Sequence, residues 1–362
     1  MEPLAKSIFD FGAIGDGKAD DTGAFAAAMS GGNKKITVPF GIYRIISTVF
    51  IESFTELVFE NGARVVCETG DKPCFSNKPD ARSFEISGAG FDGTKSDAVL
   101  SFENASDVVI CNVTFVNCPR AIKLERIEGF LVSGIRFSYF GNFSECVGTE
   151  ISAGCKNGII SDVSVLNENA LFGTLVFVHT EKGEKDEIKD ISVVGLSAMR
   201  CHRFVSLLSY GARIARIRSE GIFGGTNCAI SIFGKNDALF SDISFSGLEL
   251  FSENTQKPLF DIKANLCRFE ISFVSRPGVI DNRDGGFAPT LGFFPYDQTR
   301  YCIKNVSYDT IQKINDSSKL SSRGINPRGY DIADFEGFAV YGDRLIIPDG
   351  GYKNITFDLT EN

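Results

Sequence analysis

The feature that most constrains this chain is an internal repeat. Short segments of alternating apolar and polar residues recur along it, and one apolar residue marks each segment. The markers are Val58, Ile86, Val113, Ile135, Val163, Ile191, Ile217, Ile243, Ile271 and Val306. Subtracting neighbouring numbers gives intervals of 28, 27, 22, 28, 28, 26, 26, 28 and 35 residues. Self-similarity at such a period indicates a solenoid, a propeller or another repeat architecture.

The composition of the repeats selects strands over helices. The intervals are rich in Gly, Val, Ile, Phe and Ser and lack long stripes with a period of 3.6 residues, so helical repeats are excluded. A coil of two or three short strands that stacks on the next coil is a parallel β-helix. The ten markers therefore predict an all-β parallel β-helix of about ten coils. A propeller is the alternative, but its blades need about 40 residues each.

The N-terminal segment FDFGAIGDGKADDTGAFAAAM, residues 9–29, suits the end of such a stack. A stack end exposes unpaired strand edges and apolar interior, so terminal coils need a cap. Asp20, Asp21 and Thr22 can cap a helix N-terminus, and Phe25 belongs to an apolar stripe that can cover the first coil. We expect an N-terminal cap and helix in residues 1–35, the β-helix in 36–320, and a C-terminal cap or irregular end in 321–362.

Two segments resemble a known superfamily. FGAIGDGKADDT resembles the N-terminal signature of the pectate lyase superfamily, the pectin-lyase-like right-handed β-helices. These include polygalacturonase-type glycoside hydrolases related to family 28 and phage tailspike-like depolymerases. SGAGFDGT, residues 87–94, resembles a glycine-rich turn of those hydrolases. The resemblance implies a right-handed parallel β-helix with an N-terminal capping helix, a polysaccharide or oligosaccharide substrate, and a homotrimer.

The resemblance also gives positions for a candidate site. Polygalacturonase-type enzymes carry catalytic residues after the marker strand, in the motifs NTDG, DD, GHG and RIK on successive coils. The corresponding segments here are LNENALFG, AMRCHRF, GGTNCAISI and PLFDIKA, which keep only fragments of those motifs. The residues at these positions are Glu168 with Asn167 and Asn169, then Arg200, His202 and Arg203, then Asn227, and finally Asp261 and Lys263.

Hydrolysis of a glycosidic bond requires two carboxyl groups. They lie about 5–5.5 Å apart in retaining enzymes and about 6.5–9.5 Å apart in inverting ones, and neighbouring coils can supply either spacing. We assign the acid/base pair to Glu168 and Asp261, with Glu145 as the alternative to Asp261; Glu150 can join the same patch. The predicted substrate-binding residues are Arg200, His202, Arg203, Asn227, Lys263, Asn167 and Asn169. The positively charged side chains of Arg200, Arg203 and Lys263 would hold an acidic sugar.

Two other functions stay open beside the favoured hydrolase. One is a polysaccharide lyase or epimerase acting on an acidic glycan, with Arg203 or Lys263 as the base. The other is a non-catalytic saccharide-binding or structural β-helix, as in a tailspike. The two histidines, His179 and His202, have no metal partner in the sequence pattern. We predict neither a metal nor a cofactor.

Composition excludes several classes of partner. A net charge of −9 argues against a nucleic-acid-binding protein, since phosphates require a basic face. No stretch approaches the roughly 18 apolar residues that indicate a membrane helix. The ten cysteines lack the paired spacing of zinc sites, so we expect most of them to be reduced and buried. No signal peptide precedes the opening motif, which favours a cytoplasmic or virion-associated protein over a secreted one.

Overall fold

The chain folds into stacked coils of parallel strands. The structure, a computed structural model, describes residues 5–138, 143–166, 171–252, 260–277, 291–293, 301–307, 338–341, 344–346 and 355–360. Two compact units divide it: unit 1 is Met1–Val176 and unit 2 is Phe177–Asn362. The chain is a mainly β solenoid of about nine turns with one short helix near its N-terminus. The predicted fold class is confirmed, with about one turn fewer than the markers suggested.

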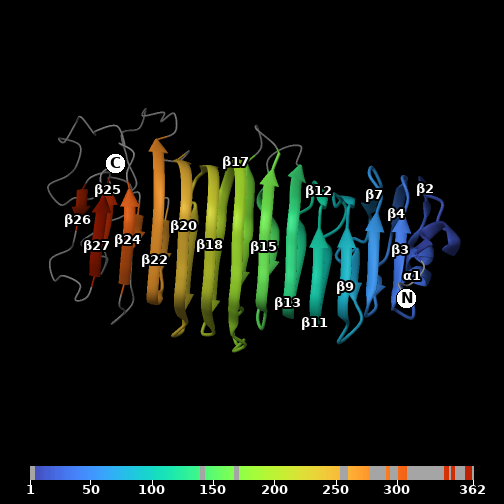
Figure 1. Cartoon of the computed structure of the whole chain (residues 1–362), viewed down its shortest axis with the longest axis horizontal. Helices are drawn as coiled ribbons and strands as arrows, with labels where there is room; N and C mark the ends of the chain where they lie inside the picture. The colour runs from blue at the N-terminus through green and yellow to red at the C-terminus, as the bar shows by residue number, and fades with distance from the viewer. Residues whose placement is uncertain are drawn as a thin grey trace. The chain divides into compact units, whose positions relative to one another are not determined.

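Three columns of parallel strands make up unit 1 (Figure 1). The first contains β1 (Lys6–Ser7), β3 (Lys34–Val38), β6 (Thr55–Phe59), β9 (Arg82–Ser87) and parts of β11 (Ala98–Cys111), β13 (Arg120–Ser138) and β15 (Lys156–Val165). The second contains β2 (Asp16–Asp20), β4 (Ile42–Ile45), β7 (Arg64–Cys67), β10 (Gly90–Asp92), β12 (Thr114–Val116) and the ends of β13 and β15. The third contains β5 (Val49–Ile51), β8 (Phe75–Asn77), the starts of β11 and β13, and β14 (Phe143–Ile151).

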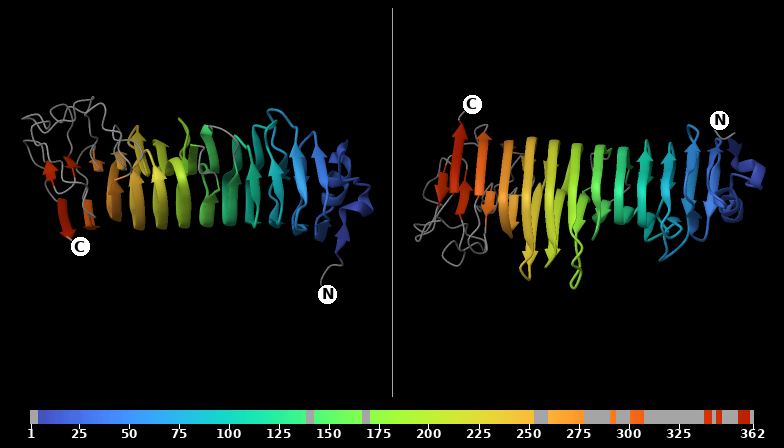
Figure 2. Two further views of the ribbon diagram at one scale, coloured as in Figure 1. Left: turned by 90° about the horizontal axis from the view of Figure 1, so that it is seen from above. Right: turned by 60° about the horizontal axis from the view of Figure 1, so that its bottom comes forward.

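Unit 2 continues the same pattern with longer strands, which lie side by side in both views of Figure 2. Its first and second columns are formed by β17 (Ile188–Tyr210), β18 (Arg213–Thr226), β20 (Leu239–Ser252) and β22 (Asn265–Pro277). The third column contains the end of β17, β19 (Ile230–Lys235), β21 (Phe260–Lys263) and β23 (Leu291–Phe293). The remaining strands are β24 (Tyr301–Ser307), β25 (Phe338–Tyr341), β26 (Arg344–Ile346) and β27 (Ile355–Thr360), and β16 (Phe172–His179) spans the division between the units.

Buried side chains stack in register along each unit. In unit 2, Ile191, Ile217 and Ile243 are paired on successive strands and are at most 1% exposed, so these three markers form one ladder. In unit 1, however, Ile86 pairs with Leu57 and not with the predicted marker Val58. Strand side chains alternate with a period of two, so this offset of one residue places Val58 on the outer face. Each buried aliphatic side chain stabilises the stack by roughly 1.5–3 kcal/mol.

The coils bend where one residue adopts a left-handed conformation. Asp190, Arg216 and Asp242 occupy equivalent corners of unit 2 with φ of 58°, 52° and 58°. Asp and Asn tolerate this conformation better than most other residues with a side chain. The guanidinium of Arg216 donates from Nε and Nη2 to the two carboxylate oxygens of Asp190, at 2.5 and 2.7 Å. These hydrogen bonds lower the pKa of Asp190 and fasten one corner to the next.

The opening glycine- and aspartate-rich motif forms a turn held by a buried carboxylate. Asp21 precedes α1 (Thr22–Met29) as its N-cap residue, but its side chain makes no capping bond. Instead the carboxylate, in a residue 2% exposed, accepts the backbone N–H groups of Ile14 at 2.6 Å and Gly15 at 3.3 Å. The predicted capping by Asp21 is therefore wrong in this detail. The role passes to Asp20, whose carboxylate accepts the N–H of Thr22 at 3.0 Å.

Helix α1 buries one aromatic side chain against the first coils of unit 1. The fully buried ring of Phe25 lies 5.6 Å from that of Tyr43, 6.3 Å from Phe59 and 5.9 Å from Phe75, measured between centroids. Edge-on and offset ring pairs at these distances add to the burial energy. The helix thus packs at the N-terminal end of unit 1, as Figure 1 shows in blue. The domain boundaries proposed at residues 35 and 320 stay predictions.

The described cysteines are mostly core residues. Eight of them are free thiols, and all of these except Cys111 are buried. Burial raises the pKa of Cys155 to about 12, so this thiol stays protonated and packs as a small apolar side chain. In the described part of the chain, no helix is long and apolar enough to cross a membrane.

Candidate functional site

The outer side chains of the third column in unit 2 form one face. In this column the residues of β17 that point outward are Ser206, Leu208 and Tyr210, and those of β19 are Ser231, Phe233 and Lys235. They face each other in register, Ser206 with Ser231, Leu208 with Phe233, and Tyr210 with Lys235. The residues between them are buried in the coil interior. We call this surface the third-column face.

An ammonium group lies over two aromatic rings on the third-column face. Lys235 Nζ is 5.5 Å from the centroid of the Tyr210 ring and 5.3 Å from that of Phe233. Both distances are within the range of an attractive cation–π contact. Both rings are half-buried, so each keeps one part against the coil and exposes another. The three side chains form a cluster with apolar surface and a positive charge.

The end of β16 adds two more rings to the same face. Phe177 and His179 stack with centroids 4.5 Å apart and planes inclined by 12°. The N–H of Thr180 donates to the carbonyl of Leu208 at 3.0 Å, and its hydroxyl is 2.9 Å from that of Ser209. These bonds place Thr180 beside Ser209. His179 consequently lies beside Leu208, packed flat on Phe177 and only 7% exposed.

The next strand carries two of the residues that the sequence proposes. In β21, Asp261 is paired with Ser231 and Lys263 with Phe233. On this next coil, an aspartate and a lysine therefore occupy the register positions that Ser231 and Phe233 occupy on β19.

The corner before the third column brings together two other predicted residues. The strand register shifts between Ala198 and Cys201, so the segment MRCHR departs from regular pairing. His202 Nδ1 lies 3.4 Å from the side-chain nitrogen of Asn227. The His202 carbonyl accepts the N–H of Cys228 at 3.0 Å, which fixes the histidine backbone to the next coil. His202 and Asn227 are therefore neighbours, as their equivalent positions predicted.

The two predicted arginines differ in their surroundings. Arg200 is exposed. Arg203 is half-buried, and its Nε is buried without a hydrogen-bond partner within the described residues. A buried unpaired donor costs free energy, and its burial separates this nitrogen from a ligand at the surface.

The other predicted carboxylates belong to unit 1. Glu168 lies outside the described residues, as do Asn167 and Asn169. Glu145 is on β14 and is exposed. Glu150, on the same strand, is 5% exposed, and its Oε2 lies 3.7 Å from Arg120 Nε. The assignment of Glu168 and Asp261 as the acid/base pair stays a prediction.

Several residues of the third-column face are absent from the sequence-based site. They are Phe177, Tyr210, Phe233 and Lys235. The signal that could have found Tyr210, Phe233 and Lys235 is the alternation in FVSLLSYG and AISIFGK, where every second side chain faces outward. Among the described residues, no group of three or more His, Cys, Asp and Glu side chains is placed to hold a metal ion.

Comparison with solved structures supports the fold. A family 28 exopolygalacturonase of Yersinia enterocolitica aligns with a TM-score of 0.66 at 14% identity, covering 84% of this chain and 71% of that one. ORF18 of Geobacillus virus E2 aligns with a TM-score of 0.50 at 14% identity, covering 84% of this chain and 62% of that one. The Agl-KA catalytic domain aligns with a TM-score of 0.50 at 12% identity, covering 99% and 68%.

The chain thus has the parallel β-helix fold of pectin-lyase-like structures, as its N-terminal signature predicted. Its fold is similar to that of the exopolygalacturonase. Identities this low show the fold alone, since one fold supports many functions. No protein-family model matches the sequence, and no curated protein matches it.

Proposed function

We propose that this chain is a carbohydrate-active enzyme that binds a polysaccharide along the third-column face of unit 2 and hydrolyses its glycosidic bonds. The observation that carries the proposal is the cluster of Tyr210, Phe233 and Lys235 beside the aligned hydroxyls of Ser206 and Ser231. Half-buried rings can pack against the C–H faces of sugar rings. Hydroxyl groups both donate to and accept from sugar hydroxyls, which fixes orientation.

The repeat suits a polymer as the ligand. Equivalent side chains on neighbouring coils recur about every 4.8 Å, a step close to the length of one sugar unit. An extended glycan that runs parallel to the stacking direction would therefore meet the same kind of side chain at each sugar. This is why we propose a polysaccharide, or an oligosaccharide derived from one, over a single small molecule.

For the chemical step we assign an acid/base role to Asp261, which is in register with Ser231. In hydrolysis a carboxylic acid protonates the departing glycosidic oxygen, while a second carboxylate activates a water or attacks the anomeric carbon. The sequence assigns the second carboxylate to Glu168 and gives Glu145 as the alternative to Asp261, and both assignments stay predictions from the sequence. His202 and Asn227 would orient the sugar, and Arg203 would donate a hydrogen bond to it.

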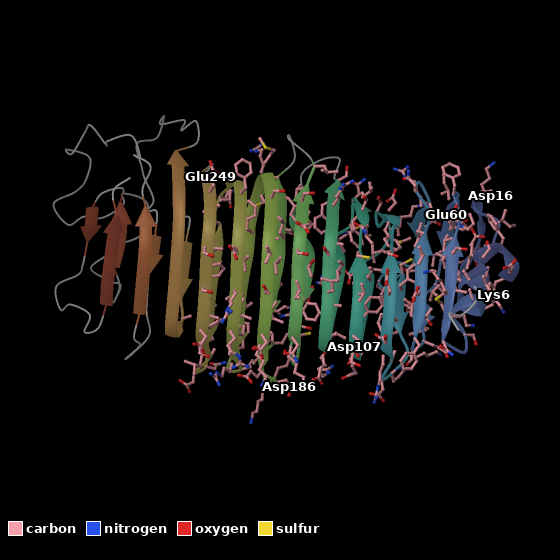
Figure 3. The ribbon with its side chains drawn as sticks, viewed as in Figure 1. Lys6, Asp16, Glu60, Asp107, Asp186 and Glu249 are labelled. Carbon is pink, nitrogen blue, oxygen red and sulfur yellow. The ribbon has the colours of Figure 1, made fainter. Side chains whose placement is uncertain are left out.

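The test is incubation with a panel of purified neutral and acidic polysaccharides, with products read by mass and ultraviolet absorbance together. We expect oligosaccharides that each carry one added water. Asp261→Asn should abolish turnover and keep affinity, whereas Asp186→Asn, an exposed change elsewhere in unit 2 (Figure 3), should change neither. Products that lack one water and absorb in the ultraviolet would replace the hydrolase with a lyase and move the base to Lys263 or Arg203.

A second candidate function is saccharide binding without cleavage. It is favoured by the make-up of the third-column face, where the described residues of β17 and β19 are hydroxyls, apolar groups and one lysine, with no carboxylate. This function predicts retention on a polysaccharide column with no product after prolonged incubation. The homotrimer implied by the tailspike resemblance stays a prediction that sedimentation of the intact chain can test.

A further inference from the structure

A groove lies on unit 1, and none of the residues assigned to the proposed function lines it. It follows the corner between the third and first columns and has a volume of about 720 Å³. That volume falls within the range of about 300–1,000 Å³ found for ligand sites. Figure 3 labels Asp107, one of its lining residues, at the lower edge of the ribbon.

The backbone explains why this corner repeats as a groove. Asn104, Arg126 and Gly154 occupy one side of the corner on successive coils, with φ of 50°, 51° and 79°. A second left-handed position follows after two residues, the first buried and the second facing outward, and it is filled by Asp107 and then Gly129, with φ of 55° and 76°. Two bends so close together recess the residues between them. Because each coil repeats both bends, the recess runs from coil to coil.

The register gives the direction and extent of the groove. Arg82, Ser106, Glu128 and Lys156 are successive partners in adjacent parallel strands, and all four line it. Three steps of about 4.8 Å span roughly 14 Å along the stack. A ligand that fills the groove is therefore elongated and runs across the strands.

The charges that line the groove balance. Three carboxylates, Asp80, Asp107 and Glu128, alternate with three cations, Arg82, Arg126 and Lys156. Lys156 Nζ pairs with Glu128 at 3.1 Å, and Arg126 Nε donates to the side-chain oxygen of Asn104 at 2.9 Å. A polyanion would meet all three carboxylates, and a polycation would meet all three cations. Neither is favoured, because like charges at short range repel.

From this geometry we propose that the unit 1 groove binds an uncharged oligosaccharide, independently of the third-column face. Sugar hydroxyls both donate and accept, so they can bond with the carboxylates and the cations in turn, and bonds to charged groups are stronger than neutral ones. No aromatic residue lines the groove. Recognition therefore rests on hydrogen bonds, which suits a hydroxyl-rich ligand better than an apolar peptide.

The experiment is calorimetric titration of the whole chain with uncharged tetrasaccharides of glucose, xylose and mannose. Ser106→Trp fills the groove from its floor, and Arg82→Ala removes one exposed cation without altering a buried contact. We expect both variants to weaken binding of the preferred tetrasaccharide about tenfold or more. Ser76→Trp, an equally outward-facing serine on β8 outside the groove, is the matched control and should leave affinity unchanged.

The Tyr210→Ala variant separates this proposal from the function assigned to unit 2. If Ser106→Trp and Arg82→Ala lower affinity and Tyr210→Ala does not, the groove on unit 1 is the site. If only Tyr210→Ala lowers affinity, the groove proposal is overturned and the third-column face is supported. Failure of every uncharged tetrasaccharide to bind, or a preference for a charged oligosaccharide or a peptide, also overturns it.

Discussion

Replacing Asp21 should destabilise the chain more than any other single acidic substitution near its N-terminus. The Asp21 carboxylate is buried and accepts two backbone N–H groups, from Ile14 at 2.6 Å and Gly15 at 3.3 Å. Hydrogen bonds to a charged group contribute about 1.5–3 kcal/mol each, and the Asp21→Ala change leaves both buried donors unpaired. We therefore expect the free energy of unfolding to fall by about 3–5 kcal/mol. Asp21→Asn should cost less, because its amide oxygen can still accept one of the two N–H groups.

Urea unfolding followed by circular dichroism measures this loss, and Asp16 supplies the control. The carboxylate of Asp16 also accepts two backbone N–H groups, from Lys18 and Ala19 at 2.8 Å, but it is exposed. Water can replace those bonds, so Asp16→Ala should cost much less than Asp21→Ala. Equal losses for the two variants would refute the argument that burial gives the Asp21 turn its importance.

Two further predictions concern unit 1. Hydrogen bonds from Lys95 and Arg44 lower the pKa of Glu68, so its contribution to stability is present at neutral pH and is lost as pH falls through that lowered pKa. The melting temperatures of wild type and Glu68→Gln should thus converge on acidification, and a gap that persists at low pH would contradict this. Gly158→Ala would place a Cβ 2.0 Å from the ring of Phe130 and should cost about 1–3 kcal/mol in urea unfolding, so an unchanged midpoint would show that the ring moves freely.

The fold could be predicted because the strongest signal in the sequence is a repeated alternation of apolar and polar residues, which is typical of strands and not of helices. Ile191, Ile217 and Ile243 recur at intervals of 26 residues and stack in one ladder. The offset at Val58 could not be seen, because Leu57 and Val58 are both apolar and only the pairing of Leu57 with Ile86 shows which of them faces inward. Apolar content identifies a strand, whereas register depends on pairing with a distant segment.

The candidate site was predicted less completely than the fold. His202 and Asn227 follow their marker strands at equivalent positions of neighbouring coils. Such positions are neighbours in space, and the two side chains do lie side by side. The aromatic cluster was missed because phenylalanine is abundant, and most of the largest buried side chains are phenylalanines. Only the alternation of the folded strand separates the outer Phe233 from the inner Phe204.

The measurement that tests the proposed function most directly is affinity electrophoresis of the intact chain in gels that contain the panel of polysaccharides. We predict that at least one polysaccharide retards the wild type, and that Tyr210→Ala weakens the interaction about tenfold, or about 1.4 kcal/mol. Phe223→Ala, which removes an exposed ring from β18 outside the third-column face, should be retarded like the wild type. Retardation by none of the polysaccharides, or equal retardation of wild type and Tyr210→Ala, would contradict the assignment of this face to saccharide binding.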